Sequence, residues 1–277
     1  GRDIPLSHGP FHLDDYIQYV YDFIQHIGKN CHIVAVCQPA VPVLAIVSIM
    51  ATINAPHKPA SMTLMGGPID TRMSPTQVNI AAKAKPLEWF EKNVIARVPH
   101  YYLGAYRRVC PGFLMLSGFM SLNIDRHMES NKTLFRHLVQ GDEESADFHR
   151  RFYNEYRSVL DLPADYYLES IYHAFQNHTL PKGEYIWKGI RVNPADITKT
   201  ALLTVEGERD DISGVGQTYA AHDLCKNIPE TLKHHHVQEG VGHYGVFNGR
   251  RWRDVIVPII SDFIRHAEKH KQKHSSH

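Results

Sequence analysis

A short apolar strand that turns at once into an apolar helix constrains the fold of this chain most. Residues 32–36 read HIVAV, a β-branched run typical of a strand that is buried on both faces. Cys37, Gln38 and Pro39 follow directly, and the apolar residues from Val41 onward predict a buried helix. A strand, a sharp turn and a helix in immediate succession predict a layered α/β protein.

Three further strands are predicted at residues 61–65, 201–205 and 234–237, and each ends in a loop rich in glycine and polar or titratable side chains. Apolar residues at helical spacing predict helices over 13–27 and 252–266. Short strands that alternate with helices favour a mostly parallel sheet, whose sites lie beyond the carboxyl ends of the strands.

A helical insertion interrupts the predicted α/β core. After about residue 75 the β-branched runs give way to long amphipathic stretches that are rich in aromatic side chains. We therefore expect core residues 1–75, a helical lid at 76–193, core residues 194–268 and a disordered tail at 269–277.

The composition excludes several classes of protein. The 277 residues carry 30 Lys and Arg against 29 Asp and Glu, so no basic surface for nucleic acid is predicted. The longest apolar stretch, 40–55, is too short and too interrupted to span a membrane. The amino end lacks the apolar segment of a secretory signal, and the 4 cysteines show no disulfide framework. We therefore expect a cytoplasmic protein.

Cys37 is the candidate nucleophile. It stands between a strand and a helix, where the tight turn of a nucleophile elbow presents a side chain to a cleft and to the amino terminus of the helix. That environment favours the thiolate. The usual elbow has glycine two residues before and after the nucleophile, whereas this chain has Ala35 and Pro39. The alternative is that Cys37 is a small buried apolar residue.

An acid and a histidine follow Cys37 in the chain order of an α/β-hydrolase triad. Asp210, or its neighbour Asp211, comes after the third predicted strand, and His243 comes after the fourth. In this arrangement His243 removes the proton of Cys37 and later protonates the leaving alcohol, while Asp210 fixes the imidazole tautomer. The backbone N–H of Gln38 is one expected oxyanion donor. A polar surface residue is the alternative interpretation of His243.

The other cysteines and histidines are predicted to be structural. The run 234–236 is all histidine, but consecutive strand residues point to alternating faces and do not converge on one metal ion. No metal site is therefore expected. Cys31, Cys110 and Cys225 lack the spacing of metal ligands and are predicted to be buried.

Aromatic and methionine side chains gather in the insertion, at residues 87–90, 101–106 and 111–120. They form either the core of a helical cap or a lid whose apolar face docks a water-insoluble substrate. On the second interpretation, the candidate substrate-binding residues are Phe113, Phe119, Met120 and Tyr244.

Seven long motifs give the chain a family resemblance. They are PLSHGPFHLDDYI, HIVAVCQPAVPVLA, MTLMGGPIDTR, VCPGFLMLSGFMSLNIDRH, FYNEYRSVLDLPADYYLESI, TVEGERDDISG and GVGHYGVFNGRRWR, and they span nearly the whole sequence. On these motifs the chain resembles the carboxyl-terminal region of the intracellular poly(3-hydroxyalkanoate) depolymerases, which have an α/β-hydrolase fold.

The resemblance implies a particular chemistry. In that family the nucleophile is a cysteine followed by Gln-Pro, which matches Cys37, Gln38 and Pro39, and the acid and base fall on Asp210 and His243. It implies thiolate attack on an ester of poly(3-hydroxybutyrate), an acyl-enzyme on Cys37, and release of hydroxybutyrate units to water or another acceptor. It also implies action on storage granules or their oligomers in the cytoplasm, without a metal or an organic cofactor.

Two other functions stay open. Polyhydroxyalkanoate synthases are similar, with a Cys-Asp-His set and the same fold, but they keep glycine where this chain has Pro39. A non-catalytic granule-binding protein, in which the lid supplies the function, is the alternative outside the enzymes. A homodimer is also compatible with the sequence.

Members of that family carry a further part of the chain before the region that this sequence resembles. Because the sequence begins with glycine rather than methionine, we expect early strands of the sheet, and the second oxyanion donor, to be missing from it. A sheet without those strands has an uncovered edge, which is a folding liability.

Overall fold

The computed structural model describes residues 1–122 and 124–275, which form two compact units. The core unit comprises His12–Ala84 and the chain from Glu169 onward, and the inserted unit comprises Gly1–Phe11 and Lys85–Leu168. The two units are defined by the contacts within each of them, and a functional lid need not begin at the same residues. The predicted boundaries at 75/76 and 193/194 therefore stay a prediction.

Four parallel strands form the sheet of the core unit, in the order β1-β2-β8-β9. They are β1 (His32–Val36), β2 (Ser61–Met65), β8 (Ala201–Gly207) and β9 (Lys233–Gln238). The first two strands have the predicted bounds, and the other two are longer than predicted. Because all four predicted strands are present and pair in parallel, the predicted parallel α/β sheet is confirmed. Because the strands are parallel, the loops that follow them gather at one edge of the sheet.

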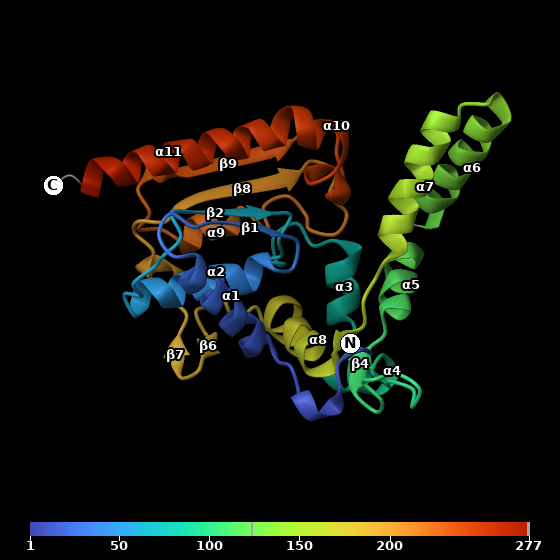
Figure 1. Ribbon diagram of the computed structural model, residues 1–277, viewed down its shortest axis with the longest axis horizontal. Helices are drawn as coiled ribbons and strands as arrows, with labels where there is room; N and C mark the ends of the chain where they lie inside the picture. The colour runs from blue at the N-terminus through green and yellow to red at the C-terminus, as the bar shows by residue number, and fades with distance from the viewer. Residues whose placement is uncertain (123, 276–277) are drawn as a thin grey trace. The chain divides into compact units, whose positions relative to one another are not determined.

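Helices cover both faces of this sheet. The helices α1 (Leu13–Ile27), α2 (Ala40–Thr52) and α9 (Ala220–Leu224) lie on one side, and α11 (Val257–Ser275) lies along the other (Figure 1). The predicted bounds of α1 are confirmed. Helix α2 is buried over most of its length because it packs against both α1 and β1.

The carboxyl-terminal helix is longer than predicted. The helix expected over 252–266 begins as α10 (Gly249–Arg251) and a π-helical turn (Trp252–Ile256), and it continues as α11. Helix α11 therefore extends beyond the predicted end at residue 266, and residues 276–277 lie outside the described residues. The predicted tail at 269–277 stays a prediction. The tail contains no glycine or proline that would stop a helix, and extending a helix costs far less than starting one.

Smaller elements complete the core unit. Helix α3 (Gln77–Lys83) follows the loop after β2, and a π-helical turn spans Ile171–Gln176. A short hairpin pairs β6 (Ile186–Trp187) with β7 (Ile190–Arg191).

The inserted unit is mainly helical, and two of its helices, α6 and α7, pack against each other. Its helices are α4 (Leu87–Asn93), α5 (Gly112–Leu122), α6 (Ile124–Gln140) and α7 (Glu143–Arg157), followed by α8 (Ala164–Ser170), which leads into the core unit. A small antiparallel sheet joins β3 (Ala96–Arg97), β4 (Arg108–Cys110) and β5 (Leu162–Pro163).

Two arginines explain why the first residues belong to the inserted unit. Arg2 Nε donates to Asp161 Oδ2 at 2.8 Å. The buried Arg107 donates to the carbonyl oxygens of Ile4 and Gly9 at 3.0 and 2.7 Å. A buried guanidinium needs such acceptors, so the hydrogen bonds of Arg107 and the ion pair of Arg2 with Asp161 hold the amino-terminal segment in the inserted unit.

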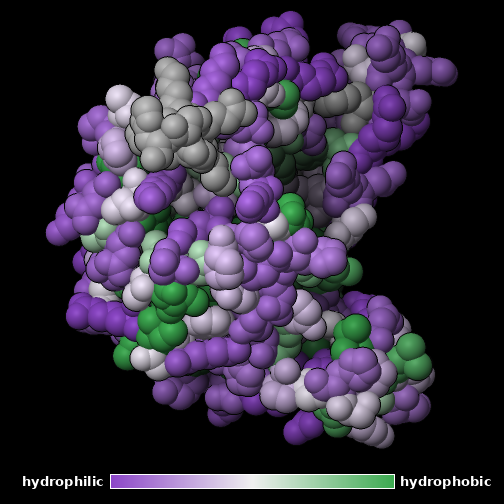
Figure 2. All heavy atoms as spheres, turned by 60° about the vertical axis from the view of Figure 1, so that its left-hand side comes forward, coloured by the Kyte–Doolittle hydropathy of each residue, from purple (hydrophilic) through white to green (hydrophobic). Residues whose placement is uncertain are grey.

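Among the described residues, no helix is both long and apolar enough to cross a membrane. The face of the molecule in Figure 2 is largely hydrophilic, and its hydrophobic side chains form separate patches.

Candidate active site

Cys37 lies in the turn between β1 and α2. Its φ is +64°, in the left-handed region that non-glycine residues rarely adopt, and its N–H donates to the Met65 carbonyl oxygen at 2.8 Å. The Ala40 N–H donates to the Cys37 carbonyl oxygen at 3.0 Å. The Cys37 side chain is partly exposed. The fold therefore holds this thiol in a strained turn at the end of a strand, which is the geometry of a nucleophile elbow.

His243 and Asp210 form a buried hydrogen-bonded pair. Asp210 lies in the turn after β8, and His243 begins the short helix that follows β9. His243 Nδ1 is 2.8 Å from Asp210 Oδ2, and the two side chains are 4% and 0% exposed. The other carboxylate oxygen accepts hydrogen bonds from the N–H groups of Ile212 and Ser213, at 2.9 and 2.8 Å. These bonds fix the carboxylate toward the imidazole, so the structure selects Asp210 rather than Asp211 as the partner of His243.

The imidazole of His243 interacts with both Asp210 and Cys37. Burial alone lowers the pKa of His243, but hydrogen bonds to Asp210 and Cys37, together with the charges of these two groups, raise that pKa to about 10. Since Nδ1 faces Asp210, Nε2 is the ring nitrogen left for Cys37. A ring with this pKa is protonated at neutral pH, and a cationic imidazole favours the thiolate of a neighbouring cysteine.

Two aromatic rings pack edge-on against the His243 ring. The ring centres of Tyr244 and Phe247 lie 5.9 and 5.8 Å from that of His243. Tyr244, a predicted substrate-binding residue, is exposed beside the site. Phe247 is not among the predicted site residues, although it lies in the same sequence motif as His243.

The remaining substrate-binding candidates belong to the inserted unit. Phe113, Phe119 and Met120 all lie on α5, where the two phenylalanines are exposed and Met120 is partly exposed. They are not part of the group in the core unit, which contains Cys37, Gln38, Asp210, His243 and Tyr244.

The backbone of Gln38 leaves a hydrogen-bond donor beside Cys37. Its carbonyl oxygen accepts a hydrogen bond from the Val41 N–H at 3.1 Å, within the first turn of the helix. Within the described part of the chain, the Gln38 N–H donates to no backbone carbonyl. This N–H is therefore available to a ligand of Cys37.

The other three cysteines are buried, as their sequence context predicts. Burial raises the pKa of the Cys110 and Cys225 thiols to about 12. Cys37 is therefore the accessible thiol among the 4 cysteines of the chain.

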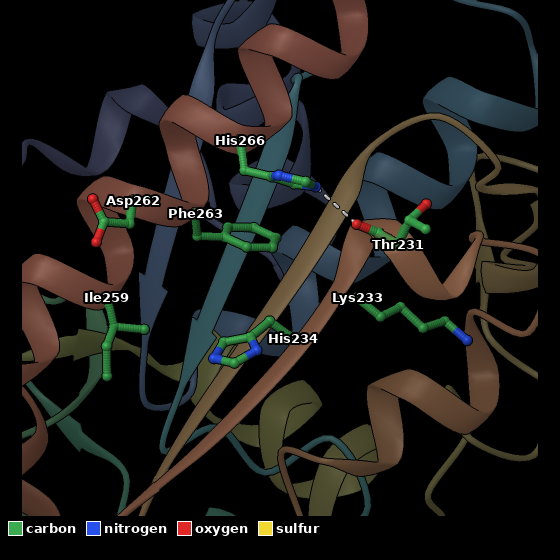
Figure 3. A pocket seen from close by; sticks show the side chains of 7 residues that line it. All are labelled: Thr231, Lys233, His234, Ile259, Asp262, Phe263 and His266. Carbon is green, nitrogen blue, oxygen red and sulfur yellow. Dashed lines mark hydrogen bonds between the residues drawn. The ribbon is translucent and has the colours of Figure 1, made fainter.

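The three consecutive histidines of β9 face different surroundings. His234 lines a hollow of about 390 Å³ between β9 and α11, together with Phe263 and His266 (Figure 3). His235 instead forms a hydrogen bond with the hydroxyl of the buried Thr204, at 2.7 Å. Over the residues that the structure describes, no group of three or more His, Cys, Asp or Glu is arranged to hold a metal ion.

The sheet, its covering helices and the strand-end loops define a protein of the α/β-hydrolase fold, and solved structures agree. BpoC of Mycobacterium tuberculosis, described as a non-heme bromoperoxidase, has a TM-score of 0.50 and 12% identity, over 96% of this chain and 79% of its own. A monoacylglycerol lipase of Paleococcus ferrophilus has a TM-score of 0.50 and 10% identity, over 93% of this chain and 77% of its own. At these identities the likeness shows the fold alone.

The family model "PHB de-polymerase C-terminus" matches residues 66–268. The chain therefore belongs to this family, the carboxyl-terminal region of poly(3-hydroxybutyrate) depolymerases, which confirms the resemblance. Family and fold together support an ester hydrolase. The matched region includes Asp210 and His243 and begins after Cys37. None of the curated proteins is significantly similar to the chain.

Proposed function

We propose that this protein is an intracellular poly(3-hydroxybutyrate) depolymerase in which Cys37 is the nucleophile, His243 the general base and acid, and Asp210 the orienting carboxylate. One observation carries the proposal. His243 Nδ1 lies 2.8 Å from Oδ2 of the buried Asp210, and the same imidazole forms a hydrogen bond with Cys37, which is partly exposed in a strained turn. Family membership indicates the polymer as the substrate.

Acylation begins when the Cys37 thiolate attacks the carbonyl carbon of an ester and a C–S bond forms. The Gln38 N–H is one donor to the oxyanion that results. The C–O bond to the alcohol then breaks, and the proton on His243 Nε2 passes to the leaving alkoxide. The products are a thioester on Cys37 and a fragment that ends in a free hydroxyl.

Deacylation uses the same groups in reverse. The neutral His243 Nε2 takes a proton from water, and the hydroxide attacks the thioester carbonyl. The C–S bond breaks, and the hydroxyacid leaves while the thiolate and the protonated ring are restored. Asp210 stabilises the cationic ring through Nδ1 in both steps.

An apolar stripe on α6 supports action at the surface of a water-insoluble polymer. Its four members lie on one face of the helix and are each more than half exposed: Ile124, Met128, Phe135 and Val139. Exposed apolar side chains that share a face mark a contact surface. We assign this α6 stripe to the granule, which places the enzyme on its substrate.

Replacing Phe135 and Val139 of the α6 stripe by serine is expected to weaken granule binding at least about tenfold, because each docked side chain contributes on the order of 1.5–3 kcal/mol. Cleavage of a soluble ester is expected to stay unchanged. Glu129→Ser with Lys132→Ser is the matched control, because this ion pair lies on the same exposed helix. Sedimentation with granules measures binding. Equal loss in both double variants would contradict the assignment.

The proposed function is tested by incubating the protein with amorphous poly(3-hydroxybutyrate) granules and, separately, with 3-hydroxybutyryl-CoA. We expect soluble hydroxybutyrate units from the granules and no polymer from the CoA ester. Polymer growth from the CoA ester would instead support a synthase-like acyl transferase. Granule binding without any ester cleavage would support a non-catalytic binding protein.

A further inference from the structure

A buried carboxylate near the end of β8 takes no part in the chemistry above. Glu206 is 1% exposed, and its Oε1 accepts hydrogen bonds from the N–H groups of Gly216, Thr218 and Tyr219 at 3.0, 2.8 and 3.1 Å. Its Oε2 lies 3.7 Å from His235 Nε2. A buried carboxylate is costly unless several hydrogen bonds compensate for its lost hydration. All three N–H donors belong to the short loop 216–219 after β8, so Glu206 holds this loop in place.

Thr218 links this loop to the turn after β2. The hydroxyl of the fully buried Thr218 accepts a hydrogen bond from the Gly67 N–H at 2.8 Å and donates one to the Gly67 carbonyl oxygen at 3.0 Å. The Asp70 N–H donates to the neighbouring Gln217 carbonyl oxygen at 3.2 Å. The loop after β8 therefore fixes the loop after β2.

Gly66 and Gly67 are in close contact with the three proposed catalytic residues. Gly66 has a φ of +53°, and a Cβ there would lie 3.2 Å from His243 Cε1 and 3.4 Å from Asp210 Oδ2. A Cβ on Gly67 would lie 3.1 Å from the Cys37 carbonyl oxygen and would overlap the start of α2. The imidazole and the nucleophile turn therefore pack against the same two residues.

We infer that Glu206 and Thr218 are positioning residues for the catalytic group. Glu206 holds the loop that carries Thr218, Thr218 holds Gly67, and the two glycines set the placement of Cys37 relative to His243. The inference rests on the proposed function for its catalytic meaning. A misplacement of about 1 Å in such a group costs on the order of 100-fold in rate.

Variants of Thr218 test the inference. Thr218→Val removes the hydroxyl and keeps the shape, whereas Thr218→Ser keeps the hydroxyl. Thr204→Val is the matched control, because Thr204 is equally buried and its hydroxyl bonds to His222 and His235. We expect kcat for a soluble ester to fall about tenfold in Thr218→Val with KM within about twofold, and to stay near wild type in the other two.

Alkylation of Cys37 by iodoacetamide supplies a readout that needs no ester. The other cysteines are buried, so mass spectrometry follows Cys37 as the pH is varied. In Thr218→Val we expect the alkylation rate of Cys37 to fall near neutral pH, because Cys37 no longer faces the cationic ring of His243. Glu206→Gln is expected to lower this rate as well, because a neutral amide oxygen is a weaker acceptor than a carboxylate oxygen for the N–H groups of Gly216, Thr218 and Tyr219.

The outcomes separate this inference from the proposed function. A folded Thr218→Val with the wild-type alkylation rate and kcat would overturn the inference, as would an equal fall in rate in Thr204→Val. If Thr218→Val does not fold, the Glu206→Gln alkylation rate decides in the same way. A wild-type protein whose Cys37 alkylates faster than that of Thr218→Val, but which cleaves no ester, would overturn the proposed function and leave the positioning role standing.

Discussion

Cys37→Ala is expected to abolish release of hydroxybutyrate from granules, with activity at least about 1,000-fold below wild type, because no C–S bond forms without the thiol. Intact-mass measurement with a slowly turned-over ester is expected to show an acyl adduct on the wild-type protein and none on the variant. Cys31→Ala is the matched control, since it removes a buried thiol of the same core unit and is expected to keep full activity. Cleavage by Cys37→Ala at the wild-type rate would remove Cys37 from the mechanism.

The backbone at Cys37 adds a test through stability. Its φ of +64° strains any residue that has a Cβ, so alanine carries the same strain as cysteine. Cys37→Gly is expected to be inactive as well, but more stable than Cys37→Ala by about 1 kcal/mol. Urea unfolding measures the difference. Equal stability of the two variants would show that the turn is not strained, which would weaken the case that this position is shaped for a nucleophile.

The parallel sheet was predictable where its strands are apolar. The segments 32–36 and 61–65 are short apolar runs that end in turn residues, and both have the predicted bounds. Strand β9 reads KHHHVQ, with a single apolar residue, and it lies at the edge of the described sheet. An edge strand needs less apolar surface, so its bounds were harder to predict.

The grouping of Cys37, Asp210 and His243 was predictable because parallel strands bring their following loops to one edge of the sheet. The choice between Asp210 and Asp211 was not, because it depends on which carboxylate reaches His243 Nδ1 and which accepts the backbone N–H groups. The hydrogen bonds between Thr218 and Gly67 join residues that are 151 positions apart, and no local sequence pattern encodes such a contact. The carboxyl-terminal helix was underestimated because composition alone suggested fraying.

Asp210→Asn is expected to lower kcat about 1,000- to 10,000-fold, the size of effect that loss of the acid has in Ser-His-Asp enzymes. An asparagine amide donates to His243 Nδ1, which moves the ring proton to Nε2. The neutral ring then carries its only proton on Nε2, so it takes no proton from the Cys37 thiol or from the water of deacylation and is no longer the base of the reaction. Rates with a soluble ester measure the loss. Asp211→Asn is the matched control and is expected to be active, and the reverse result would assign the acid to Asp211.

The same substitution changes how stability depends on pH. In the folded protein the pKa of His243 is about 10, and in the unfolded chain it is about 6.5. The folded state therefore binds this proton more tightly, so its stabilisation is complete below about pH 6.5 and is lost as the pH rises through about 10. Asp210→Asn removes the principal bond that raises the pKa of His243. The difference in urea midpoint between wild type and Asp210→Asn should therefore be largest below about pH 6.5 and should narrow as the pH rises toward 10. A urea-midpoint difference that does not change with pH would contradict a protonated His243 paired with Asp210 in the folded protein.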